Sequence, residues 1–160
     1  LEIGGGTGST AIALAPAVAD YIATDLSGEM LEIGRERCRD AGLSNLRFEQ
    51  AAADQGVLPQ GPFNAVLAFN TLHLLDDLDR GLSEIHSRLA PGGLLISKSV
   101  CLGGPLSPFR PLVATMQLFN KAPHILYLTA ARLRRTFGVQ ADILEDPVDR
   151  SRIMRFRCAL

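Results

Sequence analysis

This sequence of 160 residues lacks a charge excess of either sign, long apolar runs and an even set of cysteines. Lysine and arginine total 16 against 17 aspartate and glutamate residues, so no basic excess points to nucleic acid or an anionic membrane. No apolar run approaches the length of a transmembrane helix, and no signal peptide is visible. The three cysteines, Cys38, Cys101 and Cys158, lack metal-ligand spacing, which favours a reducing, cytoplasmic compartment and predicts no metal site.

The sequence also lacks internal repeats, low-complexity tracts and linkers, so residues 1–160 are interpreted as a single domain. It has no initiator methionine and opens on Leu1-Glu2-Ile3, a strand-like run that leads directly into glycines. Strands typically run about five to six residues. We therefore expect the N-terminal part of this domain to be missing from the sequence.

Apolar residues switch repeatedly between strand-like and helix-like spacing, which predicts an α/β fold. The expected strands cover residues 1–3, 21–24, 46–51, 65–69, 94–100, 139–144 and 153–160. The expected helices cover residues 9–15, 28–39, 78–89, 112–119 and 129–137. Ser27 is the expected N-cap of the second helix, and the run Pro91-Gly92-Gly93 should end the helix before the fifth strand.

A glycine-rich turn, Gly4-Gly5-Gly6-Thr7-Gly8, joins the first strand to the first helix. Glycine accepts positive φ and has no Cβ to block a ligand, and the helix N-terminus beyond it offers N–H groups. Because Gly6-x-Gly8-x-x-Ala11 fits the dinucleotide fingerprint, a nicotinamide- or flavin-binding oxidoreductase stays open. Asp25, at the end of the second strand, is placed either to accept both ribose hydroxyls of a ligand or to cap the following helix.

Five runs along the chain resemble, in order and spacing, the motifs of the class I S-adenosylmethionine-dependent methyltransferases: residues 1–8, 23–31, 53–54, 61–66 and 89–93. The resemblance implies a doubly wound, mostly parallel Rossmann-like sheet with an antiparallel last strand, and S-adenosyl-L-methionine as cofactor. It also implies roles for single residues. Gly4, Gly6 and Gly8 would cradle the cofactor, with Asp25 on the ribose, Leu26 and Met30 flanking the adenine, Asp54 on its amino group, Glu2 near the methionine ammonium and Asn70 beside the methyl group.

The oxidoreductase alternative gives no use to Asp54 or to the Pro-Gly-Gly run, and the sequence has no Tyr-x-x-x-Lys pair. A cofactor-binding scaffold without catalysis is a third possibility, because fold alone does not prove activity. Methyl transfer is an in-line displacement that depends mainly on positioning, and it needs a base only where the acceptor must lose a proton. His73, just beyond the fourth strand, is the candidate base; the alternative is a histidine that caps the next helix.

Residues 101–128 form the expected wall or lid of an acceptor pocket, because they leave the carboxyl end of the fifth strand and are longer than an ordinary connection. The residues predicted to line that pocket are Phe109, Met116, Phe119 and His124. Balanced charge favours a small-molecule acceptor over nucleic acid, with a lipid-like acceptor as an alternative. The sequence identifies neither the acceptor nor the oligomeric state.

Overall fold

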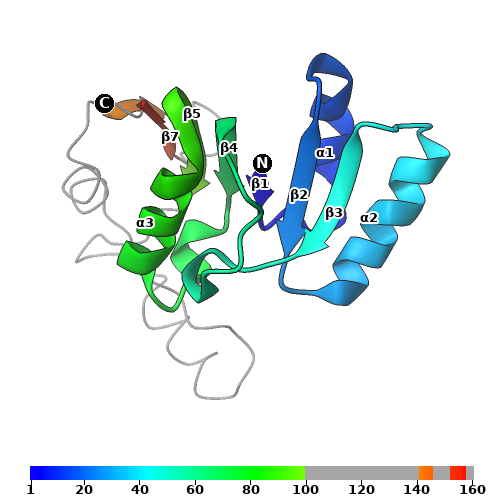
Figure 1. Ribbon diagram of the computed structural model, residues 1–160, viewed down its shortest axis with the longest axis horizontal. Coiled ribbons are helices and arrows are strands. Elements are labelled where there is room, and N and C mark those ends of the chain that lie inside the picture. The colour runs from blue at the N-terminus through cyan, green and yellow to red at the C-terminus, as the bar shows by residue number, and fades with distance from the viewer. Residues whose placement is uncertain (100–140, 146–151, 158–160) are drawn as a thin grey trace.

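The computed structural model of the chain describes residues 1–99, 141–145 and 152–157. Its strands form one seven-stranded sheet in the order β3-β2-β1-β4-β5-β7-β6 (Figure 1). The strands are β1 (Glu2–Ile3), β2 (Tyr21–Asp25), β3 (Leu46–Gln50), β4 (Phe63–Phe69), β5 (Leu89–Ser99), β6 (Ala141–Glu145) and β7 (Arg152–Arg157). The pairs from β3 through β5 are all parallel, whereas β7 lies antiparallel to both β5 and β6.

Helices cover both faces of this sheet, as a parallel sheet with apolar residues on both faces requires. The helices α1 (Ser9–Leu14) and α2 (Gly28–Asp40) lie beside β2 and β3, and α3 (Leu78–Arg88) lies beside β4 and β5 (Figure 1). Two separate apolar clusters result. One packs α3 on the sheet through Val66, Leu82, Ile85 and Leu95, and the other packs α1 and α2 on it through Ala11, Leu31 and Phe48. The predicted doubly wound, mostly parallel sheet is confirmed.

Most of the predicted element boundaries agree with the structure to within two residues. Ser27 caps α2 as predicted, with its hydroxyl accepting from the Met30 N–H, and Gly42 follows the helix with φ +65°. The fifth strand differs most, because it begins at Leu89 instead of residue 94. The predicted helices 112–119 and 129–137 and the predicted strand end at 158–160 lie outside the described residues. Three 3-10 turns complete the described elements: η1 (Ala15–Ala17), η2 (Ala53–Gln55) and η3 (Leu72–Leu74).

The prediction that Pro91-Gly92-Gly93 lies outside the fifth strand is wrong. Phe63 of β4 pairs with Leu89 and Ala65 pairs with Leu94, so the intervening residues of β5 form an irregular bulge. Proline has no N–H to donate to a ladder, and a bulge is where a strand accommodates it. Sequence periodicity cannot distinguish a bulge of this kind from a turn.

None of the described helices is both long enough and apolar enough to cross a membrane.

Candidate cofactor site

The chain reverses its direction across the sheet between β1 and β4, and a cavity of about 300 Å³ lies at that point. Ligands of open α/β sheets bind at such a switch point, outside the carboxyl ends of the strands. The cavity is lined by the carboxyl ends of β1 to β4 and by the turns that follow β3 and β4: Ile3, Gly4, Asp25, Leu26, Ala51, Ala52, Ala53, Asp54, Gln55, Asn70, Thr71, Leu74, Leu75 and Asp76.

A larger hollow of about 540 Å³ lies at the opposite, amino-terminal edge of the sheet. Its walls include Leu1, Tyr21 and Phe63, which stand at or next to the starts of β1, β2 and β4. The larger hollow contains none of the predicted site residues, whereas the smaller cavity contains five of them. The smaller cavity is therefore the candidate site.

Packing within the protein explains two of the glycines in this turn. Gly4 has φ +71°, and a Cβ there would come within 2.0 Å of the Thr71 hydroxyl oxygen, so no side chain fits. Gly8 is closed in a similar way by the ring of Phe48, which a Cβ would approach to 2.7 Å. Gly6 is different, because a Cβ there would meet nothing within 4 Å. Of these three predicted cofactor glycines, Gly6 alone faces open space.

Three N–H groups of the glycine turn donate to acceptors within the protein. The Gly5 N–H donates to the Thr24 carbonyl at 2.8 Å, and the Gly8 N–H donates to the Gly5 carbonyl at 2.9 Å. The Gly6 N–H donates to Asp25 Oδ2 at 2.8 Å. Little donor capacity is left to hold a dinucleotide pyrophosphate in this turn.

Asp25 serves the glycine turn and the start of α2 at once. Besides the Gly6 N–H on Oδ2, its Oδ1 accepts from the Ser27 N–H at 2.9 Å. The carboxylate is half-buried and lines the cavity, where the remaining lone pairs of both oxygens are available to ribose hydroxyls. The two sequence interpretations of Asp25, ribose ligand and helix cap, are therefore compatible in one geometry.

Asp54, in η2, also lines the cavity. Its Oδ2 accepts from the Asp76 N–H at 2.8 Å and from the Asp77 N–H at 3.4 Å, which fixes the turn that enters α3. No hydrogen bond to Oδ1 is found within the described parts of the chain. That oxygen is the one available to an adenine amino group.

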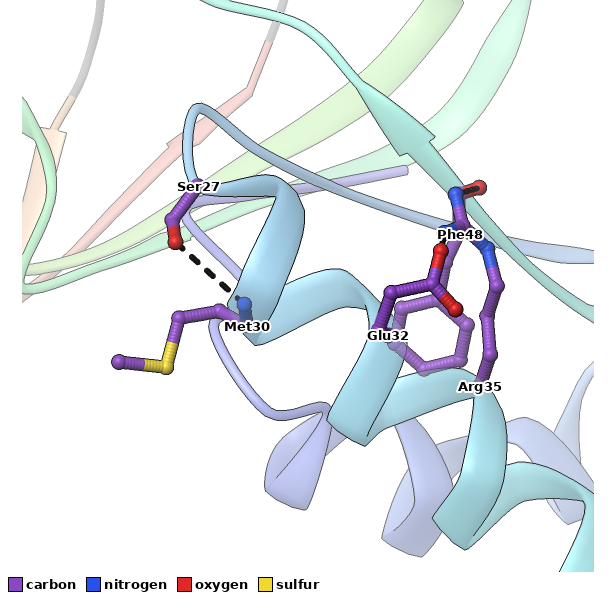
Figure 2. Close-up of polar contacts among 5 residues, drawn as sticks. All are labelled: Ser27, Met30, Glu32, Arg35 and Phe48. Carbon is purple, nitrogen blue, oxygen red and sulfur yellow. Dashed lines mark hydrogen bonds and ion pairs between the residues drawn. The ribbon is translucent and has the colours of Figure 1, made fainter.

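The structure separates the two apolar residues predicted to flank the adenine. Leu26 lines the cavity and is 59% exposed. Met30 does not line it. Figure 2 shows the Met30 N–H bonded to Ser27 and the thioether directed away from the group formed by Glu32, Arg35 and Phe48. In that group Arg35 pairs with Glu32 and donates to the Phe48 carbonyl, which ties α2 to β3.

The exit of β4 places Asn70 and Thr71 at the cavity wall. Asn70 adopts φ +54°, which is uncommon for a residue with a side chain, and its N–H donates to the Lys98 carbonyl at 2.7 Å. The Thr71 hydroxyl lies 3.1 Å from the Ile3 carbonyl and 3.0 Å from that of Phe69, the last residues of β1 and β4. Strained backbone at the end of a strand is typical of functional sites.

His73 lies in η3, between cavity-lining residues, but is not itself among them. Burial lowers the pKa of its imidazole below the ordinary 6.5, because desolvation penalises the charged form. Its Nδ1 is buried and has no hydrogen-bond partner in the described structure. The ring is therefore neutral near pH 7, but the structure does not bring it into the cavity.

Glu2 is 2% exposed and does not line the cavity either. Its carboxylate lies on the α1 side of the sheet, where Oε2 accepts from the Tyr21 hydroxyl at 3.0 Å. A Cβ on Gly5 would be 3.4 Å from the same oxygen, so the carboxylate lies directly beneath the glycine turn. Burial raises the pKa of Glu2, and the hydrogen bond from Tyr21 opposes that shift.

The charge of the cavity wall is one-sided. Three carboxylates, from Asp25, Asp54 and Asp76, line it, and among the described residues no lysine or arginine does. Such a wall favours a cationic ligand and disfavours an anionic one. No group of three residues able to hold a metal ion occurs in the described part of the chain.

Sequence reasoning overlooked Thr71 and Asp76. Thr71 lies between Asn70 and His73, which were predicted, but a threonine that fills the space over a glycine has no signal of its own in sequence. Asp76 enters the site through its contact with Asp54, which is 22 residues away in sequence. The predicted acceptor-pocket residues Phe109, Met116, Phe119 and His124, with the whole of 101–128, lie outside the described residues.

Comparison with known proteins adds a sequence match over the N-terminal part of the chain, which contains all the cavity-lining residues. Residues 1–93 match the family model described as "Methyltransferase domain". The uncharacterised methyltransferase YcgJ of Bacillus subtilis is 30% identical over 93 residues, which cover 58% of this chain and 37% of that protein. The ubiquinone/menaquinone biosynthesis C-methyltransferase UbiE of Vibrio campbellii is 32% identical over 100 residues, covering 60% and 39%. The chain thus spans well under half the length of these curated relatives.

Solved structures share the fold over nearly the whole chain. The crystal structure of B. subtilis YcgJ superposes with a TM-score of 0.84 at 15% identity, covering 99% of this chain and 91% of that one. Magnesium protoporphyrin IX methyltransferase from Synechocystis, solved with bound S-adenosylhomocysteine, superposes with a TM-score of 0.71 at 17% identity, covering 99% and 73%. At these identities the structural likeness shows the fold alone.

Proposed function

The chain belongs to the class I methyltransferase domain family, and on that premise we propose that it transfers a methyl group from S-adenosylmethionine to a small-molecule acceptor by in-line displacement. The observation that carries the proposal is the cavity at the sheet's switch point, where Asp25, Asp54 and Asn70 converge from three strand ends. Asp25 and Asp54 were predicted from two different family motifs, and Asn70 from its place just beyond the fourth strand. Their convergence on one cavity supports one ligand.

The residues present fit this cofactor. S-adenosylmethionine carries a positive sulfonium, and the cavity wall carries three carboxylates with no lysine or arginine in its described lining. Asp25 would hold the ribose, Asp54 Oδ1 the adenine amino group, and Leu26 the adenine face. The space above Gly6 leaves room for the cofactor to cross the turn. A cavity of about 300 Å³ is at the lower end of the size typical of small-molecule sites.

The same features argue against a nicotinamide or flavin dinucleotide. Its pyrophosphate would face the three carboxylates, and the N–H groups of Gly5, Gly6 and Gly8 already have acceptors within the protein. An anion in that position lacks both compensating charge and hydrogen-bond donors.

The bound cofactor would supply an activated methyl group, and the protein's task is to hold the acceptor in line with it. Asn70 and Thr71 are the residues placed for this at the exit of β4, next to the glycine turn. We propose His73 as the base where the acceptor must lose a proton, because burial keeps its imidazole neutral. We further propose that residues 101–128 form the wall of the acceptor site. We also propose that the protein is cytoplasmic.

Ligand binding followed by turnover tests this function. S-adenosylhomocysteine should raise the melting temperature of the full natural chain, and NAD⁺, NADP⁺ and FAD should not, because a ligand stabilises the fold it binds. Labelled S-adenosylmethionine incubated with pooled small metabolites should then yield a labelled product. Stabilisation by a dinucleotide without stabilisation by S-adenosylhomocysteine would refute the cofactor assignment. Binding without transfer to any acceptor would favour a scaffold.

A further inference from the structure

Glu2 carries the most buried carboxylate among the described residues, and it does not line the cavity. Glu2 pairs in register with Ala23, so its side chain shares a sheet face with Ala23 and with Tyr21, two residues earlier on β2. That face carries α1 and α2, with Tyr21, Ala23 and Leu31 in its apolar cluster. A carboxylate in such surroundings needs hydrogen bonds to remain ionised.

Two side chains supply those hydrogen bonds. The Tyr21 hydroxyl donates to Glu2 Oε2 at 3.0 Å, in a contact shielded from solvent. The Thr10 side chain, at the start of α1, hydrogen-bonds to the same carboxyl. Both act to lower the pKa of Glu2, against burial, which raises it. The pKa of Tyr21 is raised strongly by burial and by the adjacent carboxylate, so the phenol keeps its proton and remains the donor.

The position of this carboxylate connects it to the cofactor site. A Cβ on Gly5 would lie 3.4 Å from Oε2, and Gly5 is the neighbour of Gly4, which lines the cavity. An ionised Glu2 thus places a negative charge in a poorly solvated environment immediately beneath the turn. Charge interactions are stronger there than in water.

We infer that Tyr21 is a positioning residue for cofactor binding, whose hydroxyl holds the Glu2 carboxylate beneath the glycine turn as a buried anion that favours the cationic cofactor over its neutral-sulfur product. The inference rests on the proposed function and deepens it. Tyr21 touches neither the cavity nor the reacting atoms, so it acts through Glu2. Product release would benefit, because S-adenosylhomocysteine lacks the sulfonium charge.

The test measures the affinity of the full natural chain for S-adenosylmethionine and S-adenosylhomocysteine by calorimetry from pH 5 to pH 8. Among the described residues, the titratable side chain that faces Glu2 is Tyr21. Glu2 is ionised above its pKa, so affinity for S-adenosylmethionine should fall as pH drops through that raised value. Tyr21→Phe should move the midpoint up by about one pH unit, a tenfold change in proton affinity. Glu2→Gln should abolish the pH midpoint of S-adenosylmethionine binding. It should also lower the affinity for S-adenosylmethionine several-fold more than the affinity for S-adenosylhomocysteine.

Thr24→Val is the matched control. Thr24 is fully buried, and its hydroxyl also bonds to Glu2, but to the backbone carbonyl, at 2.9 Å. It should lower the melting temperature and leave both the pH midpoint and the ratio of the two affinities unchanged. If Tyr21→Phe folds poorly, Thr10→Val removes the other hydrogen bond from a half-exposed site and should move the midpoint in the same direction.

The outcomes separate the two claims. A wild-type chain that binds neither ligand would refute the proposed function. A wild-type chain that binds both, with Tyr21→Phe matching Thr24→Val in midpoint and affinity ratio, would refute the inference and leave the function standing. In that case Tyr21 would only stabilise the sheet.

Discussion

Asp25 shows how one side chain joins the fold to the site. Its two oxygens accept N–H groups from the glycine turn and from the start of α2, and the same carboxylate lines the cavity. Removing it therefore affects stability and binding together. A test of the ribose role must separate the two effects.

Asp25→Ala should weaken S-adenosylhomocysteine at least about tenfold, because each hydrogen bond to a charged group contributes about 1.5–3 kcal/mol and each 1.4 kcal/mol is about a factor of ten. Calorimetry with the 2′-deoxyribose analogue isolates the ribose contact. The wild-type chain should discriminate between the two ligands, and Asp25→Ala should not. Discrimination that survives the substitution would leave Asp25 as a cap alone.

Ser27→Ala is the control for that experiment, because Ser27 caps the same helix without lining the cavity. Loss of an N-cap costs about 1 kcal/mol of stability. Its affinity for S-adenosylhomocysteine should stay within about threefold of wild type, less than about 0.7 kcal/mol. An equal loss of affinity in both variants would show that the effect of Asp25 comes through helix capping.

At the scale of elements, α2 is held against the glycine turn by the ring of Phe48. The ring lies so close to Gly34 of α2 that a Cβ there would come within 2.5 Å of Cε1, and it closes Gly8 in the same way. Arg37 adds polar contacts, donating to the Thr7 carbonyl at 3.0 Å. The position of the turn thus depends on packing between α2 and β3, which no local propensity specifies.

Two glycine-to-alanine changes in α2 should therefore have opposite signs. Gly34→Ala should lower the free energy of unfolding by about 1–3 kcal/mol, because overpacking against Phe48 exceeds the gain of about 1 kcal/mol in helix propensity. Gly28→Ala should raise it by up to about 1 kcal/mol, since the nearest atom to its Cβ, on Gln50, is 3.9 Å away. Urea denaturation measures both. A stabilised Gly34→Ala would contradict the packing described for Phe48.

At the scale of the whole molecule, the half-buried imidazole of His73 makes stability depend on pH, because its ionisation opposes folding. Burial lowers the pKa of His73 below 6.5, so the unfolded chain binds the proton more readily than the native one. Its contribution to stability is present above pH 6.5 and is lost as pH falls from there toward the lowered pKa. Glu2 acts in the opposite sense, because a raised pKa makes its contribution fall as pH rises through that value.

Between pH 7 and pH 5 the melting temperature should fall less for His73→Gln than for the wild-type chain. Because both chains contain Glu2, its contribution to the pH dependence cancels in the comparison. Thermal unfolding monitored by circular dichroism measures both. Parallel curves for the wild-type chain and His73→Gln would mean that His73 is solvated in the native state.

The same variant tests the proposed base. If His73 takes a proton from the acceptor, His73→Gln should lower kcat by at least about a hundredfold with little change in cofactor affinity. Unchanged kcat would return His73 to a structural role in η3.

Much of this molecule followed from the sequence because the signals are local. The changing periodicity predicted the α/β sheet, and Ser27 was predicted as the N-cap of α2. Asp25, at the end of β2, was predicted to lie at the site. Each of these predictions depends on a few consecutive residues. Order along the chain also placed Asp25, Asp54 and Asn70 at strand ends, and the carboxyl ends of parallel strands lie on one edge.

Only the tertiary structure decided which atoms line the cavity and which lie behind its wall. Gly4 is a glycine because Thr71 fills its space, and Glu2 lies beneath the turn instead of in the cavity. The bulge in β5 and the bond from Asp54 to the turn before α3 are likewise set by neighbouring strands and loops. These contacts join residues far apart in sequence, and their geometry depends on how elements pack, which periodicity and motif spacing do not encode.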